Sequence, residues 1–281
     1  MNFETNKTKE ILTAHGIKLS KSMGQNFLTD PEIPKKIVRE AGFDDACGVL
    51  EIGPGLGALT MELCNAVDFV AAVELDKKLA KVLSVIFENH NNVDIIQGDA
   101  LKINIKNVAK EKLGNRTCHV CANLPYNITT PLITAIIEAD IFESLVIMIQ
   151  KEVAARICAK AGSPEYGSFT IFSNYYSYPE ILFDVSPECF FPRPKVTSTV
   201  LRMKIKKSRQ LCSEREKIFF KVVRAAFGQR RKTLINALHA VFGNTYSKDE
   251  ITSFVSNCGF DTKIRGEKLN LKEFLTLAEY F

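Results

Sequence analysis

The stretch VLEIGPGLGALT, residues 49–60, decides the fold of this 281-residue chain. An apolar run typical of a buried strand ends in Gly53, Gly55 and Gly57, and a helix-like segment follows at once. Glycines at such a turn let the backbone reverse tightly and come within contact distance of a ligand, because no Cβ intervenes. The stretch therefore predicts a nucleotide-binding turn between a strand and a helix of an α/β sheet.

Strand-like and helix-like segments alternate on both sides of this turn. Apolar strands that alternate with helices imply a parallel sheet covered on both faces. Near the end of this pattern, two strand-like segments follow each other without a helix between them. We expect them to form an antiparallel pair at one edge of the sheet. The expected strands are 47–53, 68–76, 93–100, 118–123, 144–150, 177–185 and 196–205, and the expected helices include 30–42, 58–66, 77–90 and 130–139.

The C-terminal quarter has a different character, because residues 207–281 contain no strand-like segment. We therefore expect a Rossmann-like sheet domain at residues 1–206 and a small all-helical domain at residues 207–281. Fifteen of the 37 Lys and Arg residues lie in residues 206–281, but only eight of the 32 Asp and Glu residues do. Such an asymmetry of charge indicates a polyanionic partner.

The composition also argues against several classes of protein. No apolar stretch reaches the roughly 18 uncharged residues of a membrane span, and the polar start MNFETNKTKE does not resemble a secretory signal. Eight cysteines without such a signal indicate reduced thiols in the cytoplasm. Cys118 and Cys121 form a C-x-x-C pair, but on a strand their side chains face opposite sides and no second pair completes a metal site. We expect no bound metal and no contact with a membrane.

Acidic residues follow the first three strands of the pattern and indicate which cofactor the turn binds. Glu74 stands 21 residues after Gly53, where a carboxylate can accept hydrogen bonds from two ribose hydroxyls. Gly53, Gly55 and Ala58 also fit the dinucleotide fingerprint G-x-G-x-x-A, so this segment alone leaves NAD open. Asp99 follows the third strand, where it can accept from an adenine amino group. The carboxylates after three strands, which are those of Glu51, Glu74 and Asp99, favour the cationic S-adenosylmethionine, because they would repel the pyrophosphate of NAD.

The residues NLPY, 123–126, follow the fourth strand and suit methyl transfer to an exocyclic purine amine. Such an amine is a poor nucleophile, because its lone pair is delocalised into the ring. Two fixed acceptors, the Asn123 side-chain oxygen and the Leu124 carbonyl, can bond its two N–H groups and direct the lone pair at a methyl donor. Pro125 fixes φ and removes a competing donor, and Tyr126 offers a ring on which the base can stack.

Six motifs that run in order along the chain resemble the small-subunit ribosomal RNA adenine dimethyltransferase family. They are GQNFL (24–28), EIGPGLGALT (51–60), NLPY (123–126), QKEVAARI (150–157), FFPRPKVTS (190–198) and FGQRRKTL (227–234). The resemblance implies a methyltransferase that dimethylates the exocyclic N6 amines of two adjacent adenines in small-subunit ribosomal RNA. It thereby implies a role in small-subunit biogenesis, with a pre-ribosomal particle as partner and the cytoplasm as location. We expect a monomer.

The family resemblance also implies roles for single residues. Asn26 and Leu28 belong to an N-terminal closing segment, residues 1–29, and are expected to cover the methionine end of the cofactor. Phe190 and Phe191 are expected to flank the target adenine opposite Tyr126. The residues expected to bind the cofactor are then Asn26, Leu28, Gly53, Gly55, Gly57, Glu74, Asp99 and Asn123.

Basic residues near the end of the first C-terminal helix are the expected contacts with RNA phosphates. Gly228 ends that helix, and Arg230, Arg231 and Lys232 follow it at the start of another helix, beside Arg224. Cations at the start of a helix interact unfavourably with the positive end of its dipole. Their presence there favours a role in binding an anionic ligand such as RNA phosphate.

Two other functions remain open on the sequence alone. A methylase of the erythromycin-resistance type would share the pocket but act on large-subunit ribosomal RNA. An RNA-binding assembly or transcription factor would retain the pocket only as a relict.

Overall fold

The computed structural model describes residues 5–17, 24–229 and 231–281. The segments on both sides of the glycine turn form a seven-stranded sheet with the order β4-β3-β2-β5-β6-β9-β7. Neighbouring strands from β4 to β6 are parallel, and β9 pairs with β6 in the antiparallel direction. The sheet strands are β2 (Gly48–Ile52), β3 (Phe69–Glu74), β4 (Val93–Gln97), β5 (Cys118–Asn123), β6 (Phe142–Gln150), β7 (Ser177–Val185) and β9 (Ser198–Ile205).

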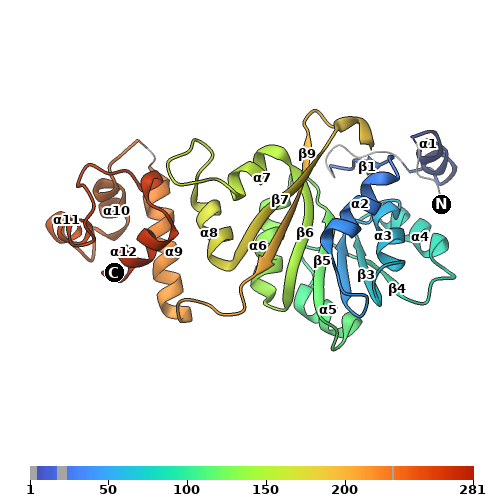
Figure 1. Cartoon of the computed structure of the whole chain (residues 1–281), viewed down its shortest axis with the longest axis horizontal. Coiled ribbons are helices and arrows are strands. Elements are labelled where there is room, and N and C mark those ends of the chain that lie inside the picture. The colour runs from blue at the N-terminus through green and yellow to red at the C-terminus, as the bar shows by residue number, and fades with distance from the viewer. Residues whose placement is uncertain (1–4, 18–23, 230) are drawn as a thin grey trace. The chain divides into compact units, whose positions relative to one another are not determined.

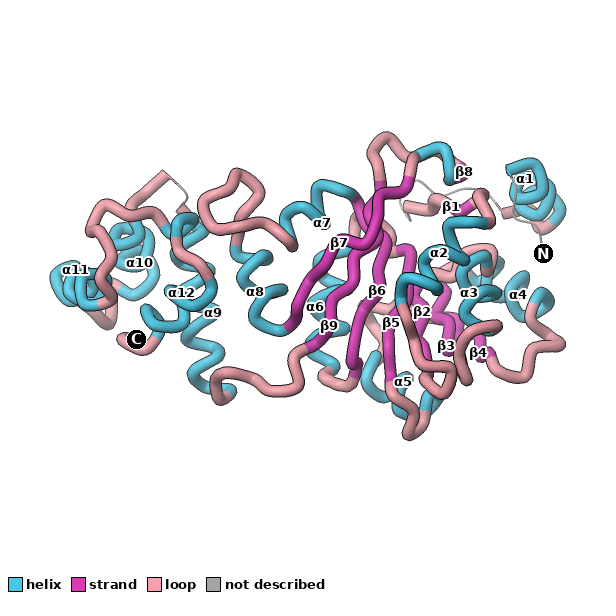
Figure 2. Tube along the Cα trace, viewed as in Figure 1, coloured by secondary structure: helices cyan, strands magenta, loops and turns pink. Residues whose placement is uncertain are grey.

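Helices lie on both sides of this sheet (Figures 1 and 2). They are α2 (Glu32–Ala41), α3 (Ala58–Cys64), α4 (Lys77–Ile86), α5 (Ile105–Leu113) and α6 (Thr129–Ala139). The helix ends follow local chemistry: Asp76 caps α4 by accepting from the backbone of Lys78 and Leu79, and Gly42 ends α2 in the left-handed conformation. The alternation of strands and helices predicted from the sequence is therefore confirmed.

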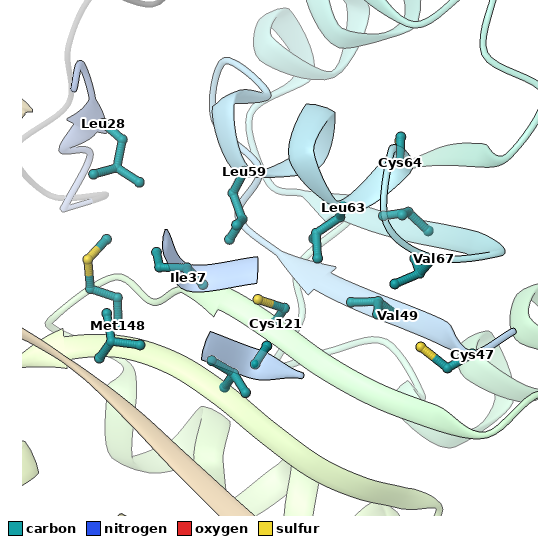
Figure 3. Packing of buried hydrophobic residues seen from close by; sticks show 14 of the residues in the cluster. Leu28, Ile37, Cys47, Val49, Leu59, Leu63, Cys64, Val67, Cys121 and Met148 are labelled. Carbon is teal, nitrogen blue, oxygen red and sulfur yellow. The ribbon is translucent and has the colours of Figure 1, made fainter. Parts of the chain in front are cut away.

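The main core lies between one face of the sheet and α2, α3 and α4. Figure 3 shows Val49, Cys121 and Met148 from three neighbouring strands facing Ile37 of α2 and Leu63 of α3. These side chains are almost fully buried, and each such aliphatic group contributes about 1.5–3 kcal/mol to folding. All five residues of β2 are buried, which explains why the strand before the glycine turn is continuously apolar apart from Glu51.

The N-terminal part is tied to the sheet by a small second sheet. Strand β1 (Phe27–Leu28) pairs with β8 (Phe190–Phe191) in the antiparallel direction, with Phe27 opposite Phe191. Helix α1 (Thr5–Ala14) adds Leu12 to a cluster that contains Phe27 and, from α4, Leu79. The 3-10 helix η2 (Pro187–Cys189) leads into β8. Residues 1–4 and 18–23 of the expected closing segment lie outside the described residues.

The chain forms two compact units, and their division differs from the expected boundary after residue 206. The sheet unit comprises Met1–Ala154 and Glu180–Ile205, and the helical unit comprises Ala155–Pro179 and Lys206–Phe281. Residues 155–179 were expected in the sheet domain because two strands follow them. They join the helical unit because Tyr175 stacks on Phe219 at 5.1 Å and the hydroxyl of Tyr176 donates to Glu216 over 2.7 Å.

The helical unit has its own apolar core, to which Phe219 and Phe274 contribute fully buried rings. Its elements are the end of α7 (Lys151–Ile157), α8 (Ser168–Tyr176), α9 (Ser213–Gly228), α10 (Leu234–Phe242), α11 (Lys248–Asn257), the 3-10 helix η3 (Gly266–Lys268) and α12 (Leu271–Ala278). Across the described part of the chain, no helix has the length and apolarity that a membrane crossing requires.

Candidate active site

A pocket lies in the sheet unit where the carboxyl ends of four parallel strands meet. It is lined by the segments that follow β2, β3, β4 and β5 and by residues 24–28. Ligands of open parallel sheets bind at this edge. The lining contains the carboxyl groups of Glu51, Glu74 and Asp99, whereas none of the described lining residues is Lys or Arg. The pocket is therefore acidic and suits a cation.

The glycine turn forms the floor of the pocket. At Gly53, φ is +72° and an added Cβ would meet nothing closer than the Asn123 carbonyl at 3.9 Å, so the backbone lies open to a ligand. At Gly55 an added Cβ would come within 3.0 Å of the Phe27 ring, so the closing segment can pack directly on the turn. Gly57 does not line the pocket. It precedes α3, and an added Cβ would lie 2.7 Å from the Phe87 ring, so its position favours a structural role over the expected cofactor contact.

Glu74 is the last residue of β3 and is 5% exposed. Its two carboxylate oxygens accept from the backbone N–H groups of Gly55, over 3.1 Å, and Asp76, over 2.8 Å. Burial raises the pKa of Glu74, while these backbone donors act in the opposite direction. The bonds hold the carboxylate at the pocket and leave lone pairs for further donors, as ribose recognition would require.

Asp99 follows β4 by two residues and also lines the pocket. Its side chain accepts from the Leu101 backbone N–H over 3.0 Å. Leu75 and Leu101, which are 45% and 40% exposed, bring apolar surface to the same pocket. Neither leucine was predicted from the sequence, although each follows one of the predicted acidic residues by one or two positions.

Glu51 lies inside β2 and not after it, which corrects the sequence-based position of the first acid. The residue is 1% exposed, and its Oε2 atom has no hydrogen-bond partner among the described residues. Burial raises the pKa of this carboxyl to about 8. An unpartnered buried oxygen at the edge of a pocket is costly unless a ligand or water reaches it.

The loop after β5 carries the predicted acceptors. The Asn123 side-chain nitrogen donates to the Asn26 backbone carbonyl over 3.1 Å, which leaves the Asn123 Oδ1 atom as the available acceptor. The Leu124 backbone N–H donates to Met148 O of β6 over 3.1 Å. Within the described residues, no hydrogen bond reaches the Leu124 carbonyl. The Thr129 hydroxyl and the Ile128 N–H donate to the Pro125 carbonyl. The loop is therefore bonded to β6 through Leu124 and to the start of α6 through Pro125.

Tyr126 lines the pocket and is half-buried. Its hydroxyl lies 2.6 Å from the hydroxyl of Ser198. Burial raises the pKa of Tyr126, so the phenol stays neutral at physiological pH. Asn26 and Leu28 also line the pocket, Leu28 with only 6% of its surface exposed.

Neither Phe190 nor Phe191, the residues expected to flank the target adenine, lines the pocket. Phe190 is 4% exposed and belongs to the core of the sheet unit. Phe191 is half-buried, and the Lys9 ammonium of α1 lies 5.1 Å from the centre of its ring. Both residues belong to β8, which pairs with β1 of the closing segment.

The basic residues of the helical unit lie on an exposed surface. Arg224 is on α9, and Arg231 and Lys232 lie in the turn before α10, which begins at Leu234 and not at the basic residues as expected. Arg230 lies outside the described residues.

Two further exposed cations in the same region, Arg265 and Lys268 of the η3 segment, were not predicted from the sequence. The Leu234 N–H donates to Ile264 O over 2.8 Å, and an added Cβ on Gly266 would lie 2.8 Å from Ala226 of α9. These contacts bring η3 to the end of α9, although about 40 residues separate the two segments in sequence. We call Arg224, Arg231, Lys232, Arg265 and Lys268 the basic surface.

A metal site can be assessed for the described residues only, and there no group of three or more His, Cys, Asp or Glu side chains is placed to hold an ion. Cys118 and Cys121 are buried free thiols in β5.

Comparison with known proteins gives consistent results. The family model of ribosomal RNA adenine dimethylases matches residues 16–281. A ribosomal RNA small subunit methyltransferase A from Alkaliphilus oremlandii is 42% identical over 273 residues, which cover 97% of this chain and 95% of that protein. The crystal structure of a dimethyladenosine transferase from Plasmodium falciparum is 27% identical, with a TM-score of 0.77 over 89% of this chain and 95% of that one.

The crystal structure of the 23S rRNA methyltransferase ErmE shares the fold, with a TM-score of 0.69, 22% identity and coverage of 90% of this chain and 98% of that one. The chain therefore belongs to the ribosomal RNA adenine dimethylase family, and it is an α/β methyltransferase that takes its methyl groups from S-adenosylmethionine.

Proposed function

We propose that this protein dimethylates the exocyclic N6 amines of two adjacent adenines in small-subunit ribosomal RNA. Relatives that are about 40% identical over nearly the whole chain carry the name ribosomal RNA small subunit methyltransferase A, which supports the small subunit over the large subunit as substrate. The single observation that carries the chemistry is the orientation of Asn123, whose nitrogen is bonded to Asn26 and whose oxygen is available at the pocket.

The acidic pocket fits S-adenosylmethionine. When bound, this cofactor supplies a methyl group on a positively charged sulphur, and it also carries an ammonium group. The acidic side chains of Glu74 and Asp99, in a lining without Lys or Arg among its described residues, favour such a ligand over a pyrophosphate. Glu74 is proposed to bind the ribose hydroxyls, and Asp99 is proposed to bind the adenine amino group. The Gly53 backbone and the side chains of Asn26 and Leu28 are proposed to lie near the methionine end of the cofactor.

Asn123 and Leu124 are proposed to hold the target amine. Asn123 Oδ1 and the Leu124 carbonyl each accept one of its N–H bonds, which draws the nitrogen towards tetrahedral geometry and aims its lone pair. Pro125 keeps the carbonyl direction fixed. Holding two reacting groups in line in this way can supply ~7–11 kcal/mol of a reaction barrier. After the first transfer a single N–H remains, so one of these two acceptors holds the amine during the second.

The ring of Tyr126 is proposed to be the stacking surface for the target adenine. A base must leave its own stack before it can enter a pocket, and contact with an aromatic ring offsets part of that cost. Base–aromatic stacking contributes about 1–3 kcal/mol. Phe191 remains a second candidate, although its ring lies outside the pocket lining and 5.1 Å from the Lys9 ammonium of α1.

The basic surface of the helical unit is proposed to bind phosphates of the RNA. Its exposed cations come from α9, the turn before α10, and η3. Cations that gather in this way neutralise phosphates and make binding depend on salt. A pre-ribosomal small-subunit particle is the proposed substrate, and the cytoplasmic location and the monomeric state stay predictions.

Transfer of labelled methyl groups to purified ribosomal subunits tests the proposal. Wild-type protein is incubated with labelled S-adenosylmethionine and either unmethylated small subunits or large subunits, and the modified nucleosides are identified by mass spectrometry. We expect N6,N6-dimethyladenosine at two adjacent positions of the small-subunit RNA and no label in the large subunit. Label confined to the large subunit would instead support the erythromycin-resistance type. RNA binding without any transfer would support an assembly factor.

A further inference from the structure

The hydroxyl of Tyr126 is held by a residue to which the sequence motifs assign no role. Tyr126 Oη and Ser198 Oγ lie 2.6 Å apart, and either hydroxyl can be the donor. Ser198 is the first residue of β9 and has no exposed surface. Because the partner is fully buried, the hydroxyl end of Tyr126 points into the protein while other parts of the residue line the pocket.

The hydrogen bond reaches across one strand of the sheet. Tyr126 follows the end of β5, whose neighbour is β6, and Ser198 lies opposite Gln150 at the end of β6. The Leu124 N–H is bonded to Met148 of the same strand. The loop that carries the proposed acceptors and the strand that carries Ser198 are thus both attached to β6, so the distance between Tyr126 and Ser198 is set by the sheet and not by a flexible loop.

A tyrosine fixed at both ends of its ring axis cannot swing about χ1. The backbone fixes one end, and the Ser198 hydroxyl fixes the other. Without that partner, the phenol would be a half-buried polar group that seeks another acceptor, at a cost in free energy. Rotation about χ1 would move the ring face away from the position that a base in the pocket requires.

We propose that Ser198 is a positioning residue that holds Tyr126 in the orientation in which the target adenine stacks. The inference rests on the proposed function, since it specifies how the base is presented to Asn123 and Leu124. Ser198 acts through Tyr126 and is not itself assigned a contact with the RNA or the cofactor.

The next residue of the same strand provides a matched control. Thr199 is also buried, but its hydroxyl donates to Asp184 over 2.6 Å, and Asp184 also accepts from Lys151 over 2.6 Å. A Thr199→Val variant therefore removes an equally buried hydroxyl from β9 without removing the partner of Tyr126.

The test is a double-mutant cycle between Ser198→Ala and Tyr126→Phe, measured as methyl transfer to unmethylated small subunits. Each single variant is expected to lower kcat/KM for the RNA about 3- to 10-fold, the usual worth of one hydrogen bond, mainly by raising KM for RNA. KM for S-adenosylmethionine should stay unchanged. The double variant should lose no more than either single variant, because each change breaks the same bond. Ser198→Thr, which keeps the hydroxyl, should recover most of the activity.

The Thr199→Val control and the thermal unfolding of each variant distinguish a positioning role of Ser198 from a general loss of stability. Thr199→Val should combine additively with Tyr126→Phe, and thermal unfolding of every variant shows how much fold is lost. Additive effects of Ser198→Ala and Tyr126→Phe, or equal changes in KM for RNA and for cofactor, would overturn the positioning role while leaving the proposed function intact. Wild-type protein that transfers no methyl group to small subunits would overturn both.

Discussion

At the scale of single residues, the orientation of the Asn123 carboxamide has the clearest physical cause. The Asn26 carbonyl can only accept, so it selects the nitrogen of Asn123 and leaves the oxygen available. We predict that Asn123→Ala lowers the single-turnover rate about 100-fold, similar to the loss of one preorganised polar group in other active sites. The dissociation constant for S-adenosylmethionine, measured by calorimetry, should change little. An equal loss of affinity and rate would assign Asn123 to cofactor binding alone.

Glu74 allows a separate prediction, because it is bonded to the glycine turn and faces the same pocket. Glu74→Ala should weaken S-adenosylmethionine binding and leave RNA binding intact. Calorimetry with the cofactor and filter binding with the RNA measure the two affinities. Glu74→Gln is the matched variant, since it keeps an acceptor for the backbone of Gly55 or Asp76. Parallel loss of both affinities in both variants would contradict the assignment.

Glu51 predicts a pH dependence of stability. Its pKa is raised to about 8 by burial, whereas the unfolded chain ionises near a pKa of about 4.3. Between these values the unfolded state binds fewer protons than the folded state, so the stability contributed by this group is lost as pH rises. The free energy of unfolding of the wild type should fall relative to Glu51→Gln by a few kcal/mol from pH 5 to pH 8, since one pKa unit is worth about 1.4 kcal/mol. Urea unfolding at both pH values measures the difference, and a constant difference would mean that Glu51 is ionised throughout.

At the scale of elements, the glycines of the turn have two different roles, ligand access and packing, which the sequence motif alone does not distinguish. Gly53 is open to the pocket, whereas Gly57, with φ at +87°, is enclosed by the Phe87 ring, which an added Cβ would meet at 2.7 Å. We predict that Gly57→Ala lowers the free energy of unfolding by about 1–3 kcal/mol through backbone strain and overpacking. Gly228→Ala is the control, because nothing lies within 4 Å of its added Cβ and its φ is not positive. That change should be neutral or stabilising by up to about 1 kcal/mol. A similar loss of stability in both variants would show that the positive φ and the Phe87 contact of Gly57 are not its cause.

At the scale of the whole molecule, charge is distributed unevenly between an acidic pocket in the sheet unit and a basic surface in the helical unit. Reversal of Arg231 and Lys232 to Glu should weaken RNA binding and reduce its dependence on salt, with the logarithmic slope falling by about 0.7–0.9 for each lost phosphate contact. The matched control reverses Lys106 and Lys110, two exposed lysines of α5. Affinity is measured by filter binding over a range of salt concentrations. An unchanged slope would exclude Arg231 and Lys232 from the RNA contacts.

The sequence by itself determined the α/β sheet, the glycine turn and the acidic residues Glu74 and Asp99 at the ends of its strands. These features are local: apolar strands, turn glycines and acids at strand ends are read from neighbouring residues, and a parallel sheet then gathers them at one edge. The family followed from motifs spread over the whole chain, and each of those motifs is also local.

Only the tertiary structure decided which side chains face one another across distant segments. Phe190 is buried and neither it nor Phe191 lines the pocket, and aromatic packing on α9 places residues 155–179 in the helical unit. The bond between Tyr126 and Ser198 spans 72 residues of sequence. The contact between Gly266 of η3 and Ala226 of α9 spans about 40 residues. Such contacts depend on the order of the strands in the sheet and on which distant segments pack against the same surface. The local periodicity and spacing of the sequence indicate neither of these.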